Sequence, residues 1–210
     1  MDRFFSLDNP VWNFLGKTWD VLWVSILWFV CSIPIVTLGA STSALYYVGL
    51  KLTKNEEGYV TKQFFHAFKQ NLKPGTILGV MAIAFGVLWA FNIRFYAGKE
   101  DSLYKVMFIL MLVVGWMYII TIHYLFAALA QFHNTIKGYI RFSFMLAVQK
   151  LGWTFLMIII NVLIILATSL FLPLILVLPG LIVVTNCSII NRCFKPYIVQ
   201  DEDQIAEEIR

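Results

Sequence analysis

The residues best suited to proton or ion chemistry are the twelve carboxylates, and all of them lie outside the apolar cores of the predicted membrane spans. Ion-coupled transporters usually keep acidic side chains inside their spans, because an ionisable group in a membrane is costly and is kept for a task. Glycoside hydrolases need two carboxyl groups that face each other across a sugar. The positions of the carboxylates therefore argue against both functions.

Histidine and cysteine form no catalytic or metal-binding pattern either. His123 lies roughly 27 Å along a helix from Lys105, at 1.5 Å per residue, near the inner membrane interface. We interpret it as an interfacial anchor, with a ligand or proton-relay role as the alternative. Cys31, Cys187 and Cys193 have no CxxC or metal-ligand spacing, and GxSxG, HExxH and Walker A motifs are absent. The sequence predicts no enzyme, no cofactor and no metal site.

Long apolar segments carry these groups. Of the 210 residues, 60% are hydrophobic and 13% are charged, whereas about 25% of a soluble domain is charged. The apolar residues form blocks of about twenty, which is the length that crosses a hydrocarbon core of about 30 Å. We predict an all-α polytopic helical membrane protein, a single membrane domain over residues 1–210. Its five or so transmembrane helices are expected at residues 20–37, 76–95, 106–126, 153–171 and 173–191, with a turn near Pro173 between the last two.

The first predicted span is followed by residues 39–74, which we interpret as a cytoplasmic amphipathic loop. Pro34 should end or kink the span, because proline lacks an amide donor and clashes with the preceding turn. The small residues around Thr37 and Gly39 mark either a helix end at the interface or, as in some transporters, a binding site. Residues 40–53 are too short to span alone, so they continue the first span or form a short interfacial helix.

Residues 61–73 predict an amphipathic helix lying in the headgroup plane, with Thr61 as its N-cap. The apolar side of this helix carries Phe64, Phe65, Phe68 and Leu72, and its polar side carries Lys62, Lys69, Gln70 and Lys73. Such a helix either grips anionic lipid or offers a docking surface to a partner protein.

Small residues form a stripe along the second predicted span. This glycine stripe consists of Gly75, Gly79, Ala82, Gly86 and Ala90, at spacings of four, three, four and four. A stripe of this kind lets two helix backbones approach closely in lipid, where no hydrophobic force drives association. We expect it to pack against another helix.

Three asparagines, Asn161, Asn186 and Asn191, lie in the last two predicted spans. Asn161 is about 12 Å along the helix from Trp153, and Asn186 lies in the fifth span. Asparagines in spans usually form hydrogen bonds with a neighbouring helix. The alternative is that they line a path for a solute.

Basic residues are distributed unevenly over the two sides that five spans define. Eleven of the sixteen lysines and arginines fall on the side of residues 39–74, and five on the other. Because cytoplasmic loops carry the excess of basic residues, the N-terminus is expected outside and the C-terminus in the cytoplasm. The net charge of +4 is too small to suggest nucleic acid as a partner. The expected partner is the lipid bilayer of the plasma membrane.

Several segments in the first part of the chain carry a family resemblance. They are the D-NP-W-F pattern at residues 8–14, the block IPIVTLGASTSALYYVGLKL, and then NEEGY and FFHAFKQNLK. Over about residues 8–80 the chain resembles the YesL family of small bacterial membrane proteins, whose molecular function is unassigned. Members tend to be encoded beside carbohydrate ABC importers and polysaccharide-degrading enzymes. The resemblance therefore implies a partner in sugar uptake and supplies no catalytic residue.

Together these observations predict a non-enzymatic membrane accessory or interaction subunit, associated with the permease subunits of a carbohydrate ABC importer. The competing hypothesis is a small-solute transporter or channel. A transporter of this size would have to act as a homo-oligomer, because five short spans with few polar side chains offer little pathway alone.

Overall fold

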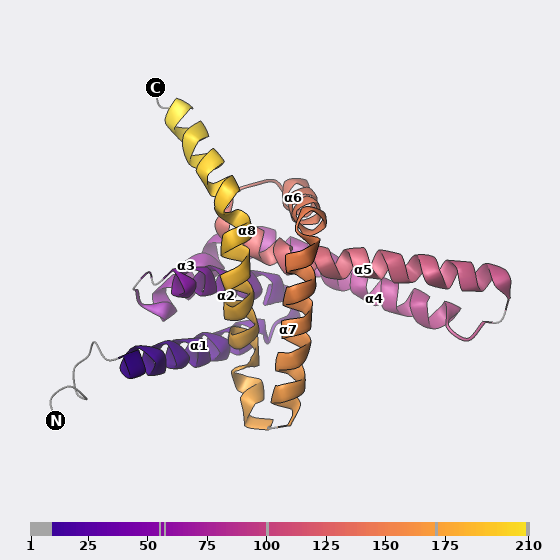
Figure 1. The fold of residues 1–210 in the computed structure, drawn as a ribbon, viewed down its shortest axis with the longest axis horizontal. Helices are drawn as coiled ribbons and strands as arrows, with labels where there is room; N and C mark the ends of the chain where they lie inside the picture. Colours follow the sequence, from indigo (N-terminus) through magenta and orange to yellow (C-terminus); the bar gives the residue numbers. More distant parts are fainter. Residues whose placement is uncertain (1–9, 55, 57, 100, 171, 209–210) are drawn as a thin grey trace.

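The computed structural model describes residues 10–54, 56, 58–99, 101–170 and 172–208 (Figure 1). These residues form eight α-helices, two short 3₁₀ helices and no strand, so the all-α prediction is confirmed. The elements in chain order are α1 (Pro10–Ser32), η1 (Ile35–Thr37), α2 (Leu38–Thr53), α3 (Val60–Gln70), α4 (Leu72–Tyr96), α5 (Ser102–Gln131), α6 (Ile136–Gln149), α7 (Leu151–Ser169), η2 (Leu172–Leu176) and α8 (Leu178–Glu208).

Three of these helices, α4, α5 and α7, are long and apolar enough to cross a membrane. Helices α4 and α5 contain the second and third predicted spans, and α7 covers the fourth as far as Ser169. The prediction of about five spans is confirmed only to this extent. Helix α1 begins ten residues before the predicted span and includes Lys17 and Asp20, whereas α8 continues past Arg192 into the charged tail.

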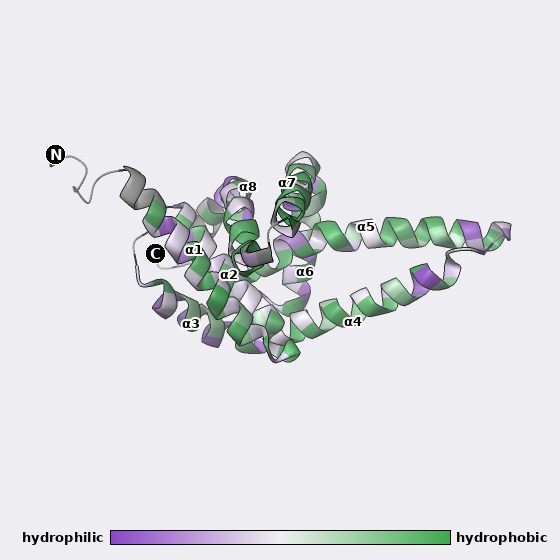
Figure 2. Ribbon diagram, turned by 90° about the horizontal axis from the view of Figure 1, so that it is seen from below, coloured by the Kyte–Doolittle hydropathy of each residue, from purple (hydrophilic) through white to green (hydrophobic). Residues whose placement is uncertain are grey.

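The helices do not form a parallel bundle. Helices α4 and α5 make a long hairpin that projects to the right in Figure 1, while α7 and α8 run across that direction. Helix α2 lies where these parts meet and contacts α1, α3, α4, α5 and α8. Along most of its length the α4–α5 hairpin is hydrophobic, and its tip is polar (Figure 2).

The predicted break at Pro34 is confirmed. Helix α1 ends at Ser32, and Pro34 takes an extended conformation with φ −74° and ψ 112°. The hydroxyl of Thr37 lies 2.7 Å from the carbonyl oxygen of Cys31 and 2.8 Å from that of Pro34, and its one proton is shared between them. The bond to Cys31 satisfies a carbonyl that the end of α1 leaves free. The chain also turns near Pro173, through η2, as predicted.

Helix α2 lies within residues 39–74, for which the sequence predicts a cytoplasmic amphipathic loop. Ten of its sixteen residues are buried, including Ala44, Leu45 and Val48. Other helices of the chain cover α2, so residues 40–53 form a separate buried helix after the break at Pro34. Their depth in a membrane stays a prediction.

Helix α3 is confirmed as a helix but is shorter than predicted. It ends at Gln70, so Leu72 belongs to α4 rather than to the face of α3. Thr61 is not the N-cap, because Tyr59 occupies that position. Instead, the Thr61 hydroxyl accepts a hydrogen bond of 2.8 Å from the indole nitrogen of Trp23, which joins α3 to α1.

Candidate functional site

The glycines of α2 and α4 form the closest helix–helix contact. A Cβ atom on Gly39 would overlap the carbonyl oxygen of Gly75. One on Gly75 would lie 2.8 Å from the Cα of Ala40, and one on Gly79 would lie 2.9 Å from the Cα of Gly39. The two backbones approach this closely only because side chains are missing at the contact. The first part of the glycine stripe therefore packs on α2 of the same chain.

The rest of the glycine stripe faces α5. A Cβ atom on Gly86 would lie 3.0 Å from the hydroxyl of Tyr118. This hydroxyl donates a hydrogen bond of 2.8 Å to the carbonyl oxygen of Ala82, and the Tyr118 ring packs on Phe85 with centroids 5.0 Å apart. Each of the three glycines in the stripe thus packs on a helix of the same chain.

The phenylalanines of α3 do not share one environment. Phe64 is fully buried against the core, whereas Phe65 is 39% exposed and Phe68 is half-buried. Lys69 and Lys73 are exposed, as predicted for the polar side. Most of the apolar face of α3 is thus used inside the molecule, which leaves Phe65 and the lysines for contact with lipid or a partner.

Hydroxyl groups in the small-residue segment around Pro34 are engaged in contacts between helices. The Ser32 and Ser41 hydroxyls lie 2.6 Å apart. The Thr42 hydroxyl accepts a bond of 3.1 Å from the indole of Trp28, and the Ser43 hydroxyl accepts one of 3.2 Å from the Asn71 amide. These hydroxyls bond α2 to its neighbours. Such a packing role is the alternative to lining a path for a solute.

Two of the predicted intramembrane polar residues come together. The Asn161 amide nitrogen on α7 lies 3.3 Å from Nε2 of His123 on α5, and His123 Nδ1 lies 2.8 Å from the carbonyl oxygen of Ile119. The Tyr124 hydroxyl, next along α5, lies 3.1 Å from that of Thr154, two turns before Asn161 on α7. Polar groups thus connect α5 to α7, and His123 faces a helix rather than a free interface.

Asn186 lies apart from that pair, in the buried contact of α8 with α2. Its side chain is 1% exposed, beside Tyr46. Burial raises the pKa of the Tyr46 phenol far above its ordinary value, and the Asn186 amide opposes this rise only in part. Tyr46 therefore stays uncharged at any physiological pH. Both groups serve packing of α2 on α8.

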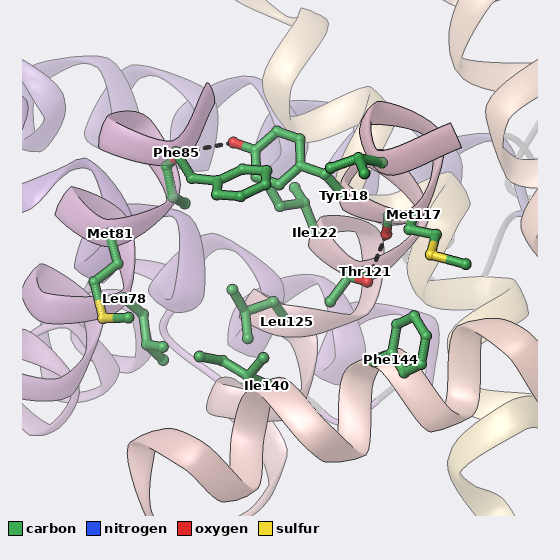
Figure 3. A pocket seen from close by; sticks show the side chains of 12 residues that line it. Leu78, Met81, Phe85, Met117, Tyr118, Thr121, Ile122, Leu125, Ile140 and Phe144 are labelled. Atoms are coloured by element: carbon green, nitrogen blue, oxygen red, sulfur yellow. Dashed lines mark hydrogen bonds between the residues drawn. The ribbon is translucent and has the colours of Figure 1, made fainter. Parts of the chain in front are cut away.

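A cavity of about 330 Å³ opens between α4, α5 and α6 (Figure 3). Sequence reasoning did not identify it, because its side chains look like any lipid-facing residues of a span. The lining residues are Leu78, Met81, Ala82, Phe85, Val114, Met117, Tyr118, Thr121, Ile122, Leu125, Ile140 and Phe144. The Thr121 hydroxyl donates to the carbonyl oxygen of Met117 at 2.7 Å, and the Tyr118 hydroxyl is also bonded to the main chain. The cavity is therefore apolar, and both hydroxyls that line it are already hydrogen-bonded to main-chain oxygens.

A second cavity, of about 410 Å³, lies between the middle of α1 and the start of α3. It is lined by Trp19, Asp20, Trp23 and the segment from Gly58 to Thr61. Aromatic faces beside a carboxylate suit a cationic group. Trp19 is 64% exposed and Tyr59 is 85% exposed, however, so these rings leave the site open instead of enclosing a ligand.

Within the part of the chain that the structure describes, no three histidine, cysteine or acidic side chains lie close enough to hold a metal ion. The ion pair found there joins Lys51 to Glu56 at 3.8 Å and lies at the surface. What the described residues do provide is an apolar cavity, a buried helix packed on glycines, and a projecting apolar hairpin.

Comparison with known proteins gives one match. The model of a family described as "Protein of unknown function, DUF624" matches residues 21–93, about a third of the chain. YesL belongs to that family, so the resemblance is confirmed for this region. The matched residues run from α1 through α4 and contain the packing of α2 on its neighbours. No curated protein and no solved structure matches the chain.

Proposed function

We propose that this protein is a non-enzymatic accessory subunit of the bacterial plasma membrane, which binds the permease subunits of a carbohydrate ABC importer. The observation that carries the proposal is the α4–α5 hairpin. Its apolar side chains extend well beyond the folded core, where no other helix that the structure describes covers them. A partner helix or lipid must cover this surface, because exposed apolar patches of this size mark interaction sites.

The outer part of the hairpin provides this surface. Val87 and Leu88 are each 63% exposed, and Phe91 is 72% exposed. The hairpin holds itself together, since the Trp89 indole donates a bond of 2.8 Å to the carbonyl oxygen of Met111 on α5. It therefore presents a preformed apolar surface. The assignment to sugar import rests on the YesL resemblance and on the DUF624 match.

The proposed topology has five spans, with the N-terminus outside and the C-terminus in the cytoplasm. It rests on the uncharged length of residues 153–191 and on the bias of basic residues. In the structure α7 and α8 run across the α4–α5 hairpin (Figure 1). Insertion of all five predicted spans therefore requires α7 and α8 to align with α4 and α5. Labelling with an impermeant maleimide tests this topology: Lys99→Cys should react from outside the cell, and Lys150→Cys only after lysis.

Affinity purification of the tagged protein in mild detergent tests the function. We expect importer permeases in stoichiometric amounts. Replacing Val87, Leu88 and Phe91 together by alanine should reduce their recovery several-fold. The matched control replaces Ile159, Leu163 and Leu166 on α7, which are 54%, 59% and 58% exposed. Equal recovery from both variants, or recovery of the protein alone as a defined oligomer, would contradict the proposal.

The competing function is a transporter or channel that acts as a homo-oligomer. The polar pair of His123 and Asn161 within apolar helices favours it, since polar groups in spans often mark solute pathways. Flux of sugars or ions into liposomes containing this protein alone would support the transporter. Absence of flux, together with permease recovery, would support the accessory subunit.

A further inference from the structure

We infer that the cavity between α4, α5 and α6 binds an anionic phospholipid, with an acyl chain in the cavity and the headgroup phosphate on Lys137 and Arg141 of α6. This inference requires membrane insertion but does not depend on the importer partner. It adds a ligand site to the molecule.

The lining of the cavity excludes polar ligands. Its two hydroxyls, on Tyr118 and Thr121, already donate to main-chain carbonyls at 2.8 and 2.7 Å. A water molecule needs two to four polar partners, so an apolar cavity of this kind stays dry. The helices that enclose it, α4 and α5, are long and apolar enough to cross a membrane. Hydrocarbon is the natural content of such a space.

The size of the cavity favours a narrow chain over a helix. One turn of an α-helix about 10 Å wide and 5.4 Å high occupies roughly 420 Å³. That is more than the whole cavity of about 330 Å³. A whole helix turn therefore does not fit inside the cavity, and a partner helix lying over its mouth would place only single side chains there. A flexible acyl chain fits.

Charge on α6 identifies the headgroup. Ile140 and Phe144 line the cavity (Figure 3), and Lys137 and Arg141 lie on the same helix face, since residues three or four positions apart are neighbours. Lys137 and Arg141 are exposed, and neither forms an ion pair with a residue that the structure describes. A cationic face thus continues the apolar cavity, as an amphipathic lipid requires.

The choice of an anionic lipid follows from electrostatics. Basic pockets between membrane helices on the cytoplasmic side bind anionic headgroups, and each nearby lysine or arginine contributes about 1 kcal/mol. Two such residues should favour an anionic over a zwitterionic headgroup by roughly thirtyfold in occupancy. Free phosphate would gain the charge interaction but leave the cavity empty.

Photo-crosslinking with lipids tests the inference. The full-length protein is reconstituted into phosphatidylcholine vesicles that contain a minor fraction of either phosphatidylglycerol or phosphatidylcholine with a diazirine in the acyl chain. Labelled peptides are identified by mass spectrometry. We expect the label on Met81, Met117 and Phe144, at a level roughly thirtyfold higher with phosphatidylglycerol.

Two variants separate the headgroup from the cavity. Replacing Lys137 and Arg141 by glutamine should abolish the preference for phosphatidylglycerol, whereas replacing Lys62 and Lys69 of α3 by glutamine should leave it unchanged. Ala82→Leu should reduce labelling by both lipids, because it fills the cavity. Equal labelling by the two lipids, or cavity labelling no higher than that of exposed α7 residues, would overturn the inference. Cross-links from the cavity to another protein chain in place of lipid would do the same.

Discussion

Helix α2 and the α4–α5 hairpin are both apolar, yet they have opposite environments. Ten of the sixteen residues of α2 are buried, compared with three of the twenty-five in α4. The buried helix is the one rich in small and hydroxylated residues, such as Ser41 and Ser43. Hydrophobicity alone therefore does not identify the core of this molecule. In a chain this apolar, small residues and shared hydrogen bonds decide which helix is enclosed.

The strongest test of this comparison is Phe64→Ala in α3. The ring of Phe64 is fully buried against the α2-centred core and stacks near Phe68, with centroids 6.3 Å apart. Its removal should lower the free energy of unfolding by about 3–5 kcal/mol, through lost contacts and the cavity left behind. Thermal unfolding in mild detergent measures the effect.

The neighbouring residue is the matched control. Phe65→Ala removes the same ring at a position that is 39% exposed, so its cost should be well below that of Phe64→Ala. Equal losses of stability would show that α3 does not dock through one face. The division between buried core and exposed surface would then fail at this helix.

A smaller effect is expected where α4 leaves the core. Gly79→Ala places a Cβ atom 2.9 Å from the backbone of Gly39, so the two helices must separate, at a cost of about 1–3 kcal/mol. Gly152→Ala in α7 is the control, because a Cβ atom there meets nothing within 4 Å. That change should stabilise the helix by about 0.5–1 kcal/mol. Similar unfolding temperatures for the two variants would contradict the glycine contact.

The sequence predicts the features that depend on local chemistry. Pro34 ends α1 because of its own ring and missing amide, and a long uncharged run must turn, as it does near Pro173. The burial of α2 could not be predicted, because a 16-residue helix with Ser and Thr satisfies the pattern of an interfacial helix equally well. The glycine stripe predicted a close helix contact but not its partner, since spacing describes one surface only.

The candidate sites show the same limit. His123 and Asn161 were each recognised as polar residues in apolar segments, but they are 38 positions apart, so only the tertiary fold reveals that they face each other. The cavity gives no sequence signal at all. Its lining residues are ordinary span residues, and its shape comes from the way α4, α5 and α6 meet.

The smallest expected effect concerns Asn161→Leu, at the connection between α7 and the base of the hairpin. The change removes the 3.3 Å contact with His123, while the bond of Tyr124 to Thr154 at 3.1 Å still joins the two helices. Hydrogen bonds between membrane helices average about 0.6 kcal/mol. The free energy of unfolding in detergent should therefore fall by about 1 kcal/mol at most.

Asn92→Leu is the matched control for this change, because the Asn92 amide donates only to the carbonyl oxygen of Leu88 in its own helix, at 2.7 Å. It should leave stability within about 0.5 kcal/mol of the parent. A loss of several kcal/mol for Asn161→Leu would mean that α7 belongs to the same cooperative core as α2. No loss of stability, combined with altered solute flux in liposomes, would mean that His123 and Asn161 serve a solute pathway. A structural hydrogen bond contributes to stability, whereas a solute-binding group need not.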